Sequence, residues 1–94
     1  MEAATAWRDY FAAWPKELPR RGVLVVTFGE QIPFEGFLTT DNLLLVERRT
    51  PDSIGARKVI VPFGQVLAIK LIDVATTKSL RAAGFAGDLP NDKT

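Results

Sequence analysis

Two neighbouring strand-like segments with large apolar residues on both faces constrain the fold of this sequence most strongly. In the stretch "FEGFLTTDNLLLVERR", residues 34–49, a two-residue turn at Asp41 and Asn42 separates two apolar runs. Consecutive residues of a strand point to opposite faces, and all four residues of the run Leu43–Val46 are large and apolar. An antiparallel sheet with one solvated face would alternate apolar and polar residues. The sequence therefore predicts a sheet that is covered on both faces.

Five segments have the composition of β-strands, and short turn sequences separate them. β-branched and other apolar residues are enriched in the segments, whereas Gly, Pro, Asp and Asn gather in the breaks. The segments are 22–29, 32–40, 43–49, 56–62 and 65–72. No crossover helix fits between any two of them, so the sequence predicts an antiparallel sheet. The turns at Asp41-Asn42 and at Phe63-Gly64 are short enough to predict that the strands they join are neighbours.

The second strand carries a glycine near its centre, and we expect the sheet to bend there. Gly36 has no side chain to pack, which is typical of a sharp bend within a strand. Simple alternation through this glycine places Leu38 on the same face as Ile32 and Phe34. Phe37 then lies on the opposite face. The sequence thus predicts a mainly β fold with an N-terminal α-helix, in which five strongly bent antiparallel strands form a small SH3-like barrel.

The N-terminal residues 3–14 predict an amphipathic helix that packs on this barrel. Its aromatic residues are spaced by 3, 4 and 7 positions, which places them on one helix face. They are Trp7, Tyr10, Phe11 and Trp14. A helix this short is marginal alone, so its aromatic face must dock. We expect it to cover part of the outer barrel face, and a neighbouring copy of the chain to cover the rest.

The chain is predicted to form one domain, residues 1–72, followed by a C-terminal tail, residues 73–94. Ninety-four residues are enough for a single hydrophobic core and too few for two. In the tail, Thr76 or Thr77 can cap a short helix that ends at Gly84. The polar residues that follow this helix predict disorder.

The composition argues against an enzyme. The chain has no Cys and no His, so it lacks thiol chemistry and the commonest general base and metal ligand. Its acidic residues have no spacing that places two carboxylates in one cleft. The net charge of +1 gives no long-range attraction to nucleic acid or membrane, and the apolar runs are too short to span a bilayer. We expect a non-catalytic cytoplasmic protein with no cofactor, no metal and no membrane partner.

One helix followed by five short strands with a glycine-bent second strand resembles the Sm/Sm-like (LSm) family of small β-barrels. The resemblance covers residues 5–72. The residues that carry it are Gly36, Leu38, Asp41 and the run Leu43–Val46 for the first family motif, and Gly64 within "VIVPFGQVLAIKL" for the second. It implies a homo-oligomeric ring of six or seven copies, in which the fourth strand of one copy pairs with the fifth strand of the next. The implied interface includes Val59, Val61, Val66 and Ala68.

The same resemblance implies single-stranded RNA near the centre of the ring, but the sequence departs from the family there. The implied RNA-facing residues are Asp41, Asn42, Phe63 and Gly64. The family's pocket asparagine is replaced by Leu45 or Val46, and Phe63 stands where the family has a cation. The spacing from Leu38 to Asp41 is also one residue short. Because a pocket needs hydrogen bonds to bases and a charge near phosphate, we expect the usual RNA pocket to be absent.

A basic cluster offers a second way to bind RNA. It consists of Arg48, Arg49, Arg57 and Lys58, beside the loop 50–55, and the chain carries two further cations, Arg20 and Arg21, at the start of the first strand. Such a cluster can follow a phosphate backbone, and its affinity then falls steeply as salt rises. Glu47 and Asp52 lie beside the cluster and partly neutralise it.

Three functions are consistent with these patterns. The first is a homo-oligomeric assembly module with little affinity for RNA. The second is an RNA-binding module that uses the basic cluster, with no DNA specificity. The third is an adaptor that offers its fourth or fifth strand to a peptide by edge pairing.

Overall fold

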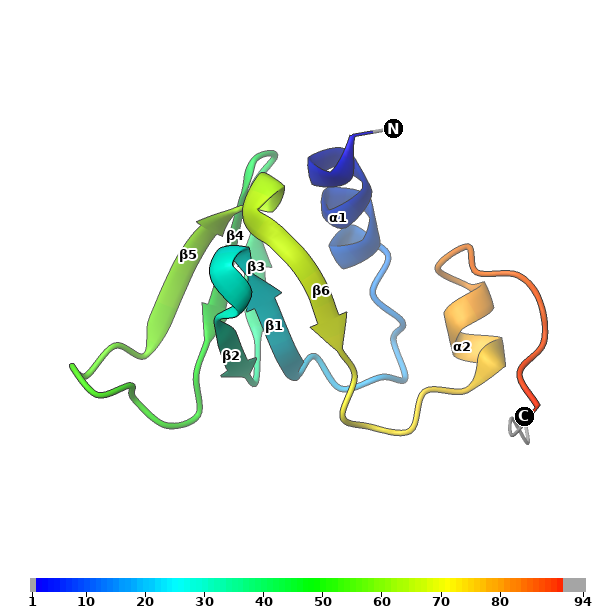
Figure 1. The fold of residues 1–94 in the computed structure, drawn as a ribbon. Helices are drawn as coiled ribbons and strands as arrows, with labels where there is room; N and C mark the ends of the chain where they lie inside the picture. Colours follow the sequence, from blue (N-terminus) through cyan, green and yellow to red (C-terminus); the bar gives the residue numbers. More distant parts are fainter. Residues whose placement is uncertain (1, 91–94) are drawn as a thin grey trace.

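The computed structural model describes residues 2–90 as an α+β fold with two small antiparallel sheets (Figure 1). The strands are β1 (Gly22–Val26), β2 (Gln31–Phe34), β3 (Phe37–Thr39), β4 (Leu43–Glu47), β5 (Lys58–Pro62) and β6 (Val66–Lys70). The first sheet has the order β2-β1-β6, and the second sheet has the order β3-β4-β5. The helices are α1 (Ala3–Ala12) and α2 (Thr77–Arg81), and the 3-10 turns are η1 (Thr27–Gly29) and η2 (Phe63–Gln65).

The prediction of a closed five-stranded barrel is wrong. The second predicted strand breaks at Glu35 and Gly36 into β2 and β3, which belong to different sheets. The expected pairing across Phe63 and Gly64 does not form either, because η2 carries the chain from β5 in the second sheet to β6 in the first. Within residues 2–90, β5 pairs only with β4 and β6 pairs only with β1. The two sheets share one core without closing on each other.

The bend between β2 and β3 lies where Gly36 was expected to allow it, but it changes which residues face the core. Ile32 and Phe34 are buried on β2, and Phe37 is buried on β3. Leu38 is 67% exposed. The predicted face of Leu38 is therefore wrong, because the bend shifts the alternation of side chains by one position.

The hairpin between β3 and β4 forms as predicted, whereas β1 is shorter than predicted. Asp41 and Asn42 form the two-residue turn, and Thr39 lies opposite Leu44 in the register. The first strand ends at Val26 because the next residues turn into η1, where the backbone of Phe28 takes a positive φ of 70°.

The aromatic face of α1 is buried, but it extends the core instead of covering an outer face. Phe11 is 2% exposed, and its ring centroid lies 4.8 Å from that of Phe37 and 6.1 Å from that of Phe63. Trp14 is buried beyond the end of the helix, and its indole nitrogen donates a 3.1 Å hydrogen bond to the carbonyl of Leu18. A large apolar side chain contributes about 1.5–3 kcal/mol when it is buried. These contacts hold a helix that would be marginal alone.

The C-terminal residues up to 90 lie beside α1 and β6 (Figure 1). The side chain of Thr76 caps α2 by accepting a 3.1 Å hydrogen bond from the Ser79 amide. An ion pair of 2.7 Å between Arg21 and Asp73 ties the start of this segment to the first strand. Of the residues predicted to be disordered, 91–94 lie outside the described part of the chain.

Candidate functional site

The outer face of the second sheet carries large apolar side chains that the described residues leave open to solvent. The strand register places Leu38, Leu45 and Ile60 opposite one another on three adjacent strands. Leu43 lies opposite Pro62, two residues along β4 and β5 from the pair Leu45 and Ile60 and on the same side of the sheet. Opposed residues of neighbouring strands have their Cβ atoms about 4.5–5.5 Å apart, so these five side chains form one continuous surface. We call it the apolar face.

The apolar face explains the sequence pattern of β4. Leu44 and Val46 are fully buried between the two sheets, so the alternate residues of the strand must point outward. Leu38 on β3 and Ile60 on β5, which is 60% exposed, flank this strand on its two sides. Exposed apolar patches of this kind mark interaction sites.

A pair of opposite charges borders the apolar face. Glu47 lies opposite Lys58 at the end of β4, and the ammonium and carboxylate groups are 3.1 Å apart. Both side chains are more than half exposed, so the pair adds at most about 1 kcal/mol to stability. Its importance is that the border presents both signs of charge side by side.

Strand edges without a partner also occur in both sheets. In the part of the chain that the structure describes, β3 and β5 are the edge strands of the second sheet and border the apolar face, whereas β2 and β6 are the edge strands of the first sheet. An unpaired edge presents backbone N–H and C=O groups that can pair with another strand.

The four residues expected at an oligomer interface lie on β5 and β6, but most of their side chains face inward. Val59 and Val61 pack against the core, and Val66 is buried within it. Ala68 lies opposite Val25 in the first sheet and is half-buried. A partner would therefore meet the backbone edges of these strands and their exposed side chains, such as Ile60 and Leu67, and not the side chains of the three valines.

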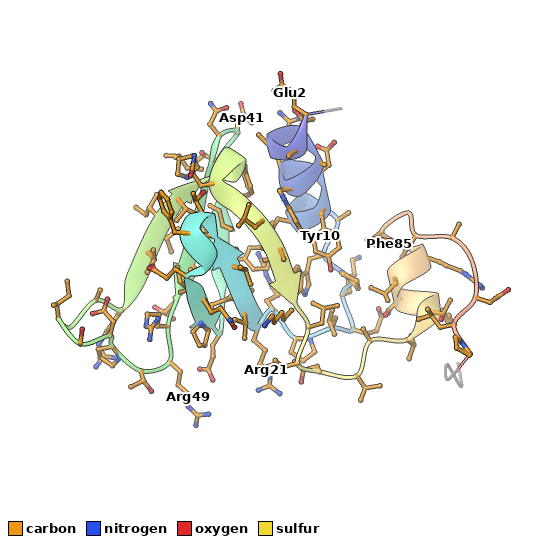
Figure 2. All side chains as sticks on the ribbon, viewed as in Figure 1. Glu2, Tyr10, Arg21, Asp41, Arg49 and Phe85 are labelled. Carbon is orange, nitrogen blue, oxygen red and sulfur yellow. The ribbon has the colours of Figure 1, made fainter. Side chains whose placement is uncertain are left out.

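Part of the basic cluster borders a groove of about 340 Å³ together with a residue from the start of the first strand. Three cations, Arg21, Arg48 and Arg49, line it, as does the carboxylate of Glu35. We call it the arginine groove. Figure 2 shows Arg21 and Arg49 at the same end of the molecule. Of the six cations considered in the sequence, these three line the groove, although Arg21 is distant from the other two in the sequence.

Nearby carbonyl and carboxylate groups already bind these guanidinium groups. Arg48 donates a 3.1 Å hydrogen bond to the carbonyl of Thr50, and Arg49 lies 3.6 Å from Glu35. The guanidinium of Arg21 forms two hydrogen bonds with Asp73. The groove thus has three cations and two neighbouring anions, which leaves only a small excess of positive charge.

The turn residues expected to face RNA lie at the other end of the molecule. Asp41 and Asn42 are exposed, and the carbonyl of Asn42 accepts a 3.1 Å hydrogen bond from the amide of Phe63. Figure 2 shows Asp41 at the end opposite Arg49. Phe63 is 1% exposed, so its ring fills the core and is not available to stack on a base. Gly64 is exposed next to it.

The perturbed carboxylates of the structure have structural partners. Hydrogen bonding to Arg21 and the charge of that residue lower the pKa of Asp73 below its ordinary value. Backbone hydrogen bonds from Ala56 and Ile54 lower the pKa of Asp52. Both groups are thus held ionised as hydrogen-bond acceptors, Asp73 beside β1 and Asp52 within the loop before β5.

Residues 2–90 contain no group of three or more His, Cys, Asp or Glu side chains that could hold a metal ion. No helix within the same range is long and apolar enough to cross a membrane.

The sequence pattern indicated an apolar outer face that needs a cover, but it did not identify Leu38 and Ile60 as exposed residues of that face. The row of Leu38, Leu45 and Ile60 can be assigned only when the bend between β2 and β3 is known, because that bend determines which way Leu38 points. Comparison with known protein families, with curated proteins and with solved structures found no match to this chain.

Proposed function

We propose that this chain is a non-catalytic module that assembles with copies of itself through the apolar face and the free edges of β5 and β6. The observation that carries this proposal is the exposure of Leu38 and Ile60 in one row with Leu45. A lone copy leaves this surface in water, and burying apolar surface gains about 25 cal/mol per Å². In an assembly, a second copy would bury the apolar face, as expected from strands that are apolar on both faces.

Two features favour a second copy as the occupant of this surface. Glu47 and Lys58 sit side by side at its border, so a second copy can meet each charge with the opposite one. The net charge of +1 gives little repulsion between copies. The resemblance to Sm/Sm-like proteins adds a route, because the fourth and fifth predicted strands correspond to β5 and β6, which both have a free edge.

Size-exclusion chromatography with light scattering tests the assembly. We expect the wild type at micromolar concentration to have a mass that is a multiple of 10.4 kDa. Replacing Leu38 and Ile60 together by Ser should lower that mass, because both residues lie on the apolar face.

The matched control replaces Ile54 and Leu89 together by Ser. These residues are also an Ile and a Leu, they are 89% and 61% exposed, and they lie outside the apolar face. The control should keep the mass of the wild type. A monomeric wild type, or equal behaviour of the two double variants, would contradict the proposal and leave the strand edges free for the peptide-adaptor alternative.

The arginine groove supports RNA binding as a second candidate function. Arg21, Arg48 and Arg49 come together there although one of them is distant in the sequence. Fluorescence anisotropy with a short single-stranded RNA should show affinity that falls with salt. The double variant Arg48→Ala with Arg49→Ala should bind more weakly, whereas Arg8→Ala with Lys16→Ala should bind as the wild type does. No binding at low salt would exclude this function.

A further inference from the structure

A cavity of about 420 Å³ lies between α1, β6 and the C-terminal segment. Its walls include Trp7 and Tyr10 from the helix, Ile69 and Leu71 from the end of the first sheet, and Leu80 and Phe85 from the C-terminal segment. Three separate parts of the chain thus converge on one space. Neither the apolar face nor the arginine groove shares a residue with it.

The aromatic rings of the cavity stand edge to face. The centroids of Trp7 and Tyr10 are 6.2 Å apart with an interplanar angle of 87°. The centroids of Tyr10 and Phe85 are 6.0 Å apart with an angle of 74°. Figure 2 shows Tyr10 on the side of α1 that faces the C-terminal segment, and Phe85 on the side of that segment that faces α1. Walls with this geometry can add a further edge-to-face or offset contact with an inserted ring.

None of the residues that line the cavity is charged, and a single side-chain hydroxyl lies among them. That hydroxyl belongs to Tyr10, and burial raises its pKa above the ordinary value, so it stays protonated at neutral pH. A charged ligand would lose its hydration there without gaining an opposite charge. An uncharged ligand with one hydrogen-bond acceptor would lose little hydration free energy, because the Tyr10 hydroxyl can donate a hydrogen bond to it.

The C-terminal segment, which forms one wall of the cavity, makes few contacts with the rest of the fold. Its displacement would let a ligand enter. Helix α2 has only five residues, and a helix of this length is not stable by itself. The segment contacts the rest of the fold through Phe85 against Tyr10, through Ala75 against the core and through the pairing of Asp73 with Arg21. Filling the cavity would add contacts to Leu80 and Phe85 and hold this segment in place.

We propose that this cavity binds a small, uncharged aromatic molecule, with its ring packed against the aromatic and aliphatic walls and one polar group near the Tyr10 hydroxyl. Pockets for small ligands have volumes of about 300–1,000 Å³, so this cavity suits a ligand at the lower end of that range. A folded protein partner or a second copy would need a wide, open surface.

The neutral fluorophore N-phenyl-1-naphthylamine is the probe for this proposal. Its fluorescence should rise with wild-type protein and saturate at one probe per chain. Ala6→Phe adds a ring beside the cavity, because Ala6 is an exposed residue of α1 that lines it. We expect this variant to bind at least about tenfold more weakly, which corresponds to about 1.4 kcal/mol.

The matched control is Ala3→Phe, which makes the same change at another exposed residue of α1 that does not line the cavity. It should bind as the wild type does, and circular dichroism should show that both variants fold. Absence of saturable binding, or equal binding by the two variants, would overturn the proposal. Loss of binding in the double variant Leu38→Ser with Ile60→Ser would also overturn it, because the probe would then sit on the apolar face or between copies.

Limited trypsin digestion gives a second readout. Lys78 and Arg81 are exposed on α2, the element that the ligand would hold in place. The probe should slow cleavage after these residues in the wild type and in Ala3→Phe, but not in Ala6→Phe. Equal cleavage rates with and without the probe in the wild type would contradict a ligand that contacts Leu80 and Phe85.

Discussion

At the scale of single residues, Gly22 at the start of β1 and Gly36 between β2 and β3 have opposite surroundings. A Cβ atom added at Gly22 would lie 2.7 Å from the backbone carbonyl oxygen of Lys70 and 3.6 Å from the ring of Phe34. At Gly36 no atom lies within 4 Å of an added Cβ. The bend at Gly36 therefore does not need a missing side chain, whereas the pairing of β1 with β6 needs one at Gly22.

Gly22→Ala should lower the free energy of unfolding by about 1–3 kcal/mol, because the strands β1 and β6 would have to move apart. Gly36→Ala is the matched control and should change the free energy of unfolding by less than about 0.5 kcal/mol. Urea denaturation measures both. Equal losses in the two variants would show that the contact with Lys70 does not limit the fold.

The ion pair of Asp73 with Arg21 makes stability depend on pH. The pKa of Asp73 is lowered in the folded state, so its contribution is present above the ordinary value of 3.8. This contribution is lost as the pH falls through the lower, folded-state pKa. The Asp73 side chain is 18% exposed, so water screens the pair in part.

On acidification from neutral pH, the wild type should therefore lose more stability than Asp73→Asn, which has no such proton to bind. Thermal melts followed by circular dichroism across the acid range measure the difference. The variant Asp41→Asn, in the exposed turn between β3 and β4, should follow the wild type. Parallel curves for wild type and Asp73→Asn would exclude a contribution from this pair.

At the scale of elements, α1 depends on a small number of aromatic contacts. Phe11→Ala should lower the free energy of unfolding by about 3–5 kcal/mol, because a side chain that packs against Phe37 and Phe63 is removed from the core. Asp9→Ala, on the exposed side of the same helix, should change it by less than about 0.5 kcal/mol. Urea denaturation measures both variants. A small effect of Phe11→Ala would mean that α1 is dispensable for the core.

The elements that the sequence predicted well are those that depend on neighbouring residues. The aromatic spacing of α1, the turn at Asp41 and Asn42 and the break near Gly36 all follow from local patterns. The errors concern pairing between distant segments. The turn at Phe63 and Gly64 looked like a hairpin, but η2 sends β6 to β1, and no local pattern indicates which strand edge the chain will meet.

The candidate site was less predictable than the elements for the same reason. The direction of Leu38 depends on a shift of one position at the bend, and that of Val66 depends on its pairing with Val26. The grouping of Arg21 with Arg48 and Arg49 needs the first sheet to lie beside the end of β4. Residue types in the sequence suggested the chemistry, but the fold decided which residues share a surface.

At the scale of the whole molecule, the described chain is elongated, with extents of 41 × 29 × 23 Å. Figure 1 shows β5 and the loop before it on one side, and α2 with the C-terminal segment on the other. The apolar face and the aromatic cavity thus belong to different sides of the molecule. A second copy on the apolar face would leave the cavity open to the proposed ligand, whereas a copy paired with the edge of β6 would lie near it, because Ile69 of β6 lines the cavity.

The proposed assembly would make thermal stability depend on protein concentration, because the copies would bind one another only when folded. The melting temperature of the wild type should rise over about a hundredfold increase in concentration. That of Leu38→Ser with Ile60→Ser should stay constant, and that of Ile54→Ser with Leu89→Ser should rise as in the wild type. Differential scanning fluorimetry measures the trend. A constant melting temperature in the wild type would contradict self-association.

The free edges of β5 and β6 have a consequence for the purified protein. If the β5 edge of one copy pairs with the β6 edge of the next, the contact is head to tail. The rotation between successive copies then determines whether the assembly closes into a ring or continues as a fibre. Lys58 and Pro62 terminate β5, so a visiting strand can align with only a few residues between them. Small changes near these two residues would therefore alter particle size and shape before they alter the fold of the individual chain.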